Sequence, residues 1–103
     1  MATTRHENFE WDEDKQSSTR VKHGIDFLDA IRIFDGRKVV RIPSGHPDEE
    51  RFGVIGQLSG RMVFVVYTVR NDKVRIITAR RARKNEERQY HQSHPGGGDP
   101  PEG

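Results

Sequence analysis

The 103-residue sequence predicts an α+β fold with two N-terminal helices, an antiparallel four-stranded sheet and one C-terminal helix. Two observations lead to this class. Apolar residues recur with a helical period over residues 27–34, and four segments rich in β-branched residues follow between residues 38 and 80. The loops between these segments are short, which favours antiparallel neighbours, so we expect the helices to pack on a single antiparallel sheet.

The first two elements are expected to be helices. Residues 12–23 start at Asp12, a favourable N-cap, and end before Gly24, which can adopt the left-handed conformation that follows many helices. The next segment, IDFLDAIRIF, follows the candidate cap Asp26 and stops at Gly36. Its apolar side chains have the i, i+3, i+4, i+7 spacing of a core-facing helix: Phe27, Ala30, Ile31 and Phe34.

Four strands and a last helix complete the expected domain. The strand candidates are KVVRI, RFGVIGQ, RMVFVVYTVR and KVRIITAR, and the short FEW segment is a candidate additional edge strand. The last helix is predicted for residues 82–92. We therefore expect a flexible polar leader over residues 1–8, a single domain over residues 9–92, and a disordered Gly- and Pro-rich tail over residues 93–103.

Composition excludes several classes of protein. Cysteine is absent, which removes disulfides, thiolate metal sites and cysteine nucleophiles. The histidines lack metal-ligand spacing, and neither a Gly-rich phosphate loop nor a GxSxG motif is present, so we expect no metal site and no cofactor. No signal peptide and no apolar run of about 20 residues is visible, which predicts a soluble cytoplasmic protein that binds no membrane.

Positive charge is concentrated towards the C-terminal end of the expected domain. The formal net charge is only +2, but residues 70–88 contain eight Lys or Arg against three acids. A local field of this kind attracts polyanions such as nucleic acid. A solvated surface would explain the same composition equally well, so the placement of the arginines has to discriminate between the two interpretations.

The predicted hairpin between the last two strands brings three donors together. A two-residue turn at residues 71–72 pairs Thr68 with Arg75, and Arg70 then lies on the same face near one end of the sheet. An arginine can bind two phosphate oxygens through its planar guanidinium group and keeps its charge at every physiological pH. Simple decoration of a hairpin tip is the alternative.

Two further groups of residues are candidates for function. Arg83, Glu87 and Tyr90 are predicted to share one face of the last helix, where a surface ion pair and a core-closing ring are the structural alternatives. Lys22 and His23 lie at the end of the first helix. A histidine there can transfer protons near neutral pH, or it can simply stabilise the helix end.

Taken in order, five segments of the chain resemble the BrnT family of bacterial type II toxins. They are FEWDEDK, KHGIDFLDAIRIFD, the strand from EERF to VIG, VVYTVR, and RIITARRARKNEERQY. The resemblance covers residues 9–90 and depends on the order and spacing of the motifs more than on any one of them. Two departures are visible, because Thr19 stands where the family often has Asn, and ITAR replaces the common ISAR at residues 77–80.

The resemblance implies a RelE-like fold and a metal-independent ribonuclease that inhibits translation and growth. Its implied partners are an RNA substrate and a BrnA-type antitoxin, usually a ribbon-helix-helix protein that alone contacts operator DNA. By position, the family's charged motif residues imply the catalytic candidates His23, Lys22, Glu50, Arg51, Arg80, Arg81, Glu87 and Tyr90. Candidate phosphate ligands are Arg70, Arg75, Arg80 and Arg83. A non-catalytic module that binds nucleic acid or an acidic protein through the same arginines is the alternative.

Overall fold

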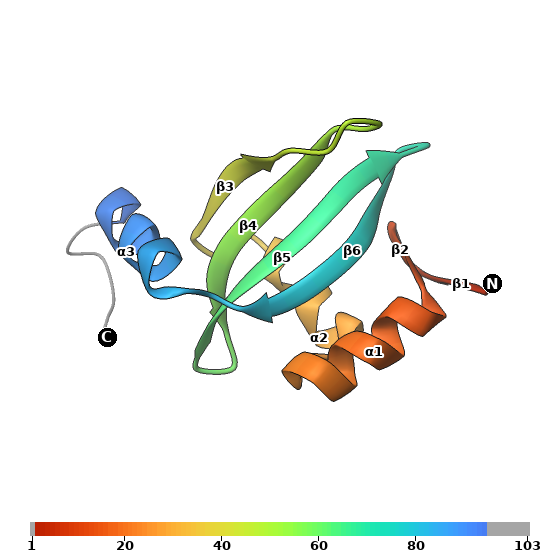
Figure 1. The fold of residues 1–103 in the computed structure, drawn as a ribbon, viewed down its shortest axis with the longest axis horizontal. Coiled ribbons are helices and arrows are strands. Elements are labelled where there is room, and N and C mark those ends of the chain that lie inside the picture. The colour runs from red at the N-terminus through yellow and green to blue at the C-terminus, as the bar shows by residue number, and fades with distance from the viewer. Residues whose placement is uncertain (1, 95–103) are drawn as a thin grey trace.

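A six-stranded mixed sheet forms the centre of the computed structural model, which describes residues 2–94 (Figure 1). The strands lie in the order β1-β2-β6-β5-β4-β3. Their bounds are β1 (Thr3–His6), β2 (Phe9–Asp12), β3 (Val39–Ser44), β4 (Arg51–Leu58), β5 (Arg61–Arg70) and β6 (Lys73–Arg81). The helices are α1 (Glu13–His23), α2 (Phe27–Ala30), the 3₁₀ helix η1 (Ile31–Phe34) and α3 (Lys84–Ser93). The predicted α+β class is therefore confirmed.

The four predicted strands form the antiparallel meander β3 to β6, as expected. The turn between β5 and β6 places Asn71 at φ 50° and Asp72 at φ 65°. Two positive φ angles are characteristic of the type I′ turn, whose twist matches that of the flanking strands. The predicted register of this hairpin is correct, because Thr68 pairs with Arg75.

The N-terminal part of the sheet differs from the prediction. The FEW segment lies in β2, which is not an edge strand but sits between β1 and β6 and runs parallel to β6. Strand β1 occupies Thr3–His6, within the residues expected to form a flexible leader. The polar sequence TTRH has no apolar alternation that would indicate a strand, and the loop-length rule addresses only strands that are neighbours in sequence.

The helix ends are better predicted than the helix lengths. Asp12 and Asp26 accept the capping bonds of α1 and α2, and Gly24 ends α1 at φ 69°. The expected second helix changes after Ala30 from α to 3₁₀ geometry, so that Ile33 is buried as well. Helix α3 starts at Lys84 rather than at residue 82 and includes Ser93, which was expected to belong to the disordered tail, while residues 95–103 of that tail lie outside the described residues.

Both faces of the sheet carry apolar clusters, but of different size. The larger one lies under α2 and η1 and includes the fully buried Trp11 and Phe27. The smaller one consists of Ile55, Phe64 and Tyr90, the last from α3. Figure 1 shows α3 at one end of the sheet beside β3 and β4, so that it covers only part of its face.

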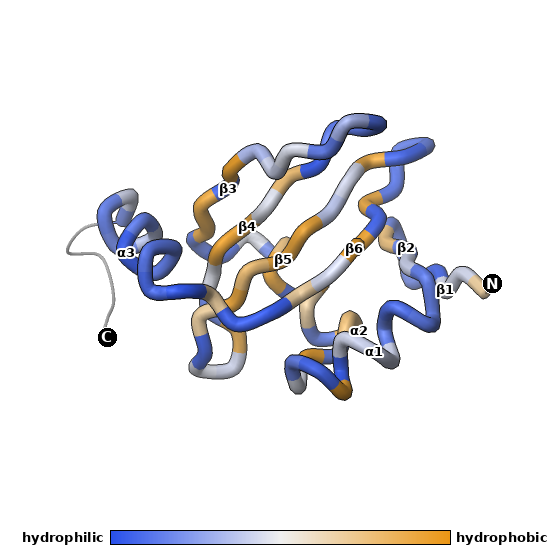
Figure 2. Tube along the Cα trace, viewed as in Figure 1, coloured by the Kyte–Doolittle hydropathy of each residue, from blue (hydrophilic) through white to orange (hydrophobic). Residues whose placement is uncertain are grey.

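Helix α1 has almost no apolar surface, as Figure 2 indicates by its mostly hydrophilic colouring. Its one large apolar side chain, Val21, is 86% exposed. Polar contacts attach α1 to the rest of the domain instead. Gln16 accepts a hydrogen bond from the Trp11 indole (3.0 Å) and donates to Asp26 (2.9 Å). Burial raises the pKa of Asp26, but the bonds from Gln16, the Leu28 N–H and Arg20 outweigh it and lower that pKa overall.

A bulge in β6 decides which side chains share a face. Val66 pairs with Thr78 and Tyr67 pairs with Ile76, so Ile77 is an extra residue without a partner in β5. Without it, Arg75 and Arg80 would point to opposite faces, because they are an odd number of residues apart. The bulge reverses the alternation and brings both arginines to the face that α3 partly covers.

No helix within residues 2–94 is long and apolar enough to cross a membrane.

Candidate functional site

The candidate site lies on the part of the sheet that α3 leaves open. We call it the polar face and define it by the residues that the strand register brings together: Arg51, Thr68, Arg70, Arg75, Thr78 and Arg80. These side chains come from the three adjacent strands β4, β5 and β6. The opposite side of the same strands carries Val63, Val65 and Ile76, which belong to the larger apolar cluster.

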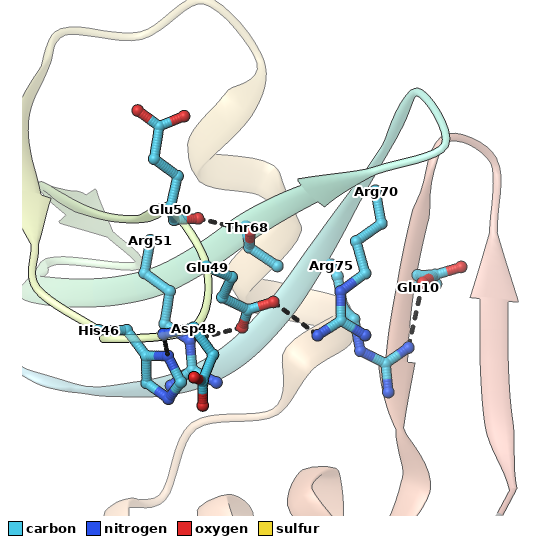
Figure 3. Close-up of polar contacts among 9 residues, drawn as sticks. All are labelled: Glu10, His46, Asp48, Glu49, Glu50, Arg51, Thr68, Arg70 and Arg75. Atoms are coloured by element: carbon cyan, nitrogen blue, oxygen red, sulfur yellow. Dashed lines mark hydrogen bonds and ion pairs between the residues drawn. The ribbon is translucent and has the colours of Figure 1, made fainter.

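At one end of the polar face, Glu49 lies between two arginines (Figure 3). Its carboxylate accepts from Arg70 Nη2 at 2.6 Å and from Arg51 Nε at 2.7 Å. These two hydrogen bonds lower the pKa of Glu49 to about 2, so the carboxylate is ionised at neutral pH. The Arg70 side chain remains 49% exposed, which leaves it accessible to a ligand.

A second carboxylate, that of Glu10 in β2, likewise contacts two arginines. It accepts from Arg75 Nη1 at 3.0 Å and lies 3.7 Å from Arg5 Nε. A guanidinium has five N–H donors, and no other contact of Arg75 is found within residues 2–94. Figure 3 shows Arg70 and Arg75 extending in the same direction from the β5–β6 hairpin. Both are therefore oriented by a carboxylate while keeping donors for a phosphate.

The structure bears on two of the candidates at this end of the face. Thr68 cannot serve as a free donor, because it is 3% exposed and its hydroxyl donates to the Glu50 carbonyl at 2.6 Å. The Glu50 carboxylate points away from the arginines in Figure 3. The acid that faces the arginines is the neighbouring Glu49, which is not among the candidates from the sequence.

At the other end, Arg80 is engaged on every side. Its guanidinium forms a two-bond pair with Glu86 (2.9 and 2.8 Å), donates to the Arg81 carbonyl (3.1 Å) and stacks 4.5 Å above the Phe64 ring. The hydrogen bonds from Arg80 lower the pKa of Glu86, against the opposing effect of burial. Since Glu86 also accepts from the Arg83 N–H at 2.8 Å, this arrangement attaches α3 to the sheet.

Lys22 and His23 lie beside the middle of the polar face. Together with Lys15, Ser18 and Thr19 of α1 they line a pocket of about 100 Å³ whose sixth wall residue is Thr78 of β6. Thr78 lies between Arg75 and Arg80 in the sequence of β6 and on the same face. The fold therefore brings the predicted Lys22-His23 pair next to the predicted arginines, from elements far apart in sequence.

The remaining candidates at the C-terminal end do not join this face. Arg81 pairs with Val63, on the opposite side of β6 from Arg80. Arg83 is the N-cap of α3, and within the described chain it forms no ion pair with Glu87, which is exposed. Tyr90 is 6% exposed in the smaller apolar cluster, so the predicted shared helix face is wrong and the ring closes the core.

Each of the three acids that hold the arginines has a recognisable signal in the sequence. Glu10 is the only charge in the otherwise apolar FEW segment, which predicts a charge facing away from the core. Glu49 lies two residues before Arg51, the spacing that puts side chains on one side of a strand. Glu86 occupies the third position of α3, where an acid accepts the N-cap N–H.

No group of three His, Asp or Glu side chains suited to a metal ion is present in residues 2–94. The charge of the polar face comes from arginines. Arg5, Arg51, Arg70, Arg75 and Arg80 outnumber the carboxylates of Glu10, Glu49 and Glu86 that contact them. The surplus is positive, which suits a negatively charged ligand.

The fold and the site together define a small α+β protein with a cationic sheet face suited to a polyanion. Comparison with known families identifies it further. Residues 11–86 match the model of the ribonuclease toxin BrnT of type II toxin-antitoxin systems, and the chain belongs to this family. No curated protein matches the chain.

Membership of the family has two direct consequences. The family is one of ribonucleases, and a toxin of a type II system has an antitoxin as its partner. The matched range contains the last two residues of β2, α1, β3 to β6 and the start of α3, and thus all residues of the polar face and its pocket. Glu87 and Tyr90 lie beyond it.

Proposed function

We propose that this chain is a metal-independent endoribonuclease that binds RNA on the polar face and cleaves it beside the α1 pocket. The cleavage would inhibit translation and growth until a BrnA-type antitoxin of the ribbon-helix-helix class covers the enzyme. The observation that carries this proposal is the β6 bulge, because it alone puts Arg75 and Thr78 on one face beside Lys22 and His23. The proposal places this activity in the bacterial cytoplasm.

Arg75 and Arg70 are the proposed phosphate ligands. Cleavage of RNA by its own 2′-hydroxyl builds additional negative charge on the phosphate oxygens, and fixed cations stabilise this charge more than that of the ground state. Glu10 and Glu49 hold the two guanidinium groups in place, so little reorganisation is needed when RNA binds. Arg51 shares Glu49 with Arg70 and extends the same surface.

His23 is the proposed proton-transfer residue. A general acid or base has to remove the 2′-hydroxyl proton or protonate the leaving 5′-oxygen, and histidine does so most readily near neutral pH. Of the carboxylates considered from the sequence, Glu50 points away from the arginines and Glu87 is exposed on α3. Lys22 beside His23 adds positive charge where the leaving group develops its negative charge.

Induced expression in bacteria tests this function. The parent chain is expected to arrest growth and to produce new 5′ ends in total RNA, whereas His23→Ala and Arg75→Ala accumulate as folded protein without arrest. Arg61→Ala and His91→Ala are the matched controls, since both residues are exposed and lie outside the polar face. Both control variants are expected to remain toxic.

The same experiment has two outcomes that would contradict the proposal. Normal growth with intact RNA from the folded parent chain would favour the non-catalytic binding module. Full toxicity of both His23→Ala and Arg75→Ala would remove the proposed site while leaving the ribonuclease intact. Cleavage by the purified chain should also persist in excess EDTA, and its loss there would contradict metal independence.

A further inference from the structure

The pocket between α1 and β6 has a composition that the proposed proton transfer does not require. Its six lining residues are Lys15, Ser18, Thr19, Lys22, His23 and Thr78. Two of them are cations, one is a histidine, three carry hydroxyl groups and none is an acid. This is the set of donors that binds an oxyanion, and it differs from the rest of the polar face, where every arginine contacts a carboxylate.

Thr19 is the unusual member of this set. It is only 4% exposed, and no hydrogen bond of its hydroxyl is found among residues 2–94. The neighbouring Ser18 instead donates to the Lys15 carbonyl at 3.3 Å. Buried hydroxyl groups are almost always satisfied, and leaving one without a partner costs about 1 to 3 kcal/mol. An orphaned hydroxyl in the wall of a cationic pocket indicates a ligand that completes it.

We propose that this pocket is a phosphate subsite, in which the hydroxyl groups of Thr19 and Thr78 and the cations of Lys15 and Lys22 hold one phosphodiester of the RNA. The assignment to RNA rests on the proposed ribonuclease function, whereas the affinity for phosphate does not. The pocket volume of about 100 Å³ is several times the roughly 30 Å³ that a water molecule occupies in the liquid, which is room for a phosphate group.

The position of the pocket makes it a phosphate contact separate from that of Arg75. Thr78 and Arg75 pair with Val66 and Thr68 of β5, which are two residues apart because the bulge at Ile77 takes up one residue of β6, so their separation along the sheet is roughly 7 Å at about 3.3 Å per residue. A single phosphate does not span that distance. Arg75 and the pocket therefore bind different phosphates of one RNA strand, and His23 in the pocket wall lies beside the second of them.

The Thr19→Val variant tests whether the Thr19 hydroxyl binds a ligand or supports the fold. Valine keeps the shape of threonine and removes an unsatisfied polar group, so the free energy of unfolding should stay unchanged or rise. Binding of inorganic phosphate, followed by the amide resonances of residues 19–23 and 78, should weaken about five- to tenfold, the value of one hydrogen bond. Ser17→Ala, an exposed position on the same helix, is the control and should bind phosphate like the parent.

RNA cleavage then distinguishes the two proposals. A Thr19→Val variant that binds phosphate weakly and shows a raised KM with a similar kcat supports the subsite as part of the ribonuclease. If Thr19→Val binds phosphate more weakly than the parent chain but the parent chain cleaves no RNA, the anion site stands and its assignment to RNA is overturned. Unchanged phosphate affinity in Thr19→Val, or a marked loss of stability, would overturn the subsite, even if the parent chain cleaves RNA.

Discussion

The two ends of the polar face use the same residue type for different purposes. Arg80 makes two bonds to a buried glutamate, one to a carbonyl and a stacking contact with Phe64. Arg75 and Arg70 each make a single bond to a carboxylate. Exposure does not distinguish Arg75 from Arg80, because their side chains are 20% and 21% exposed. The number of contacts does.

This difference shows why positive charge in a sequence is a weak guide to function. Arg80 closes a polar gap between β6 and α3, so its removal should act through stability. Arg75 is oriented from one side only and retains donors for a ligand, so its removal should act through binding and catalysis. Variants at the two ends of the polar face should therefore fail in different assays.

The largest effect is expected at Arg75. Arg75→Ala should lower the rate of RNA cleavage by about 10² to 10³, the typical loss for one transition-state donor. Its matched control is Glu10→Gln, which breaks the same ion pair from the acidic side and leaves the arginine in place. Glu10→Gln should retain most of the activity in the same cleavage assay. Equal losses in the two variants would assign the pair a structural role and contradict the comparison.

Arg80→Ala should be the most destabilising of these variants. It leaves the Glu86 carboxylate, 10% exposed, without its partner and removes the cation from the Phe64 ring. Loss of a buried ion-pair partner and of a cation–π contact together should cost about 2 to 3 kcal/mol, which urea unfolding would measure. An unchanged unfolding midpoint, combined with loss of cleavage, would instead restore Arg80 to the active site.

Arg70→Ala is expected to have an intermediate effect on binding alone. The side chain is half exposed and at the edge of the face, so its loss should weaken RNA binding about tenfold and reduce the dependence of log K on log salt by about one unit. Stability should change little, since the lost pair is partly solvated. A salt dependence equal to that of the parent would mean that Arg70 contacts no phosphate.

The smallest expected effect is that of low pH on the free energy of unfolding. Because hydrogen bonds from Arg70 and Arg51 lower the pKa of Glu49 to about 2, this group stabilises the fold above its ordinary pKa near 4.5. That contribution is lost as the pH falls from about 4.5 to 2. The difference in unfolding free energy between the parent and Glu49→Gln should therefore shrink over this interval. A difference that stays constant from pH 6 to pH 2.5 would contradict the ion-pair geometry.

Much of the fold was predictable because its signals are local. Helix caps at Asp12 and Asp26, the turn at residues 71–72 and the register of the hairpin follow from residue type and spacing. The parallel pairing of β2 with β6 joins residues more than sixty positions apart, for which a single sequence contains no spacing rule. The short polar strand β1 lacks the apolar alternation that identifies strands.

Several residues of the candidate site could be proposed from the sequence, but their geometry could not. The sequence indicated Arg70, Arg75 and His23, and the structure brings them to one side of the sheet. The apolar pattern of β6 does not reveal that Ile77 is an extra residue. Strict alternation of side chains along this strand therefore predicts Arg75 and Arg80 on opposite faces. The carboxylate partners were missed for a similar reason, since Glu10, Glu49 and Glu86 meet their arginines only in the folded chain.

NMR can map directly where RNA contacts the polar face. A short RNA with 2′-O-methyl groups cannot attack its own phosphates and would be titrated into the labelled parent chain. We expect shifts of the amides in residues 70–80 of the β5–β6 hairpin and in residues 19–23 of α1. Shifts confined to α2 and η1, on the opposite side of the sheet, would contradict this expectation.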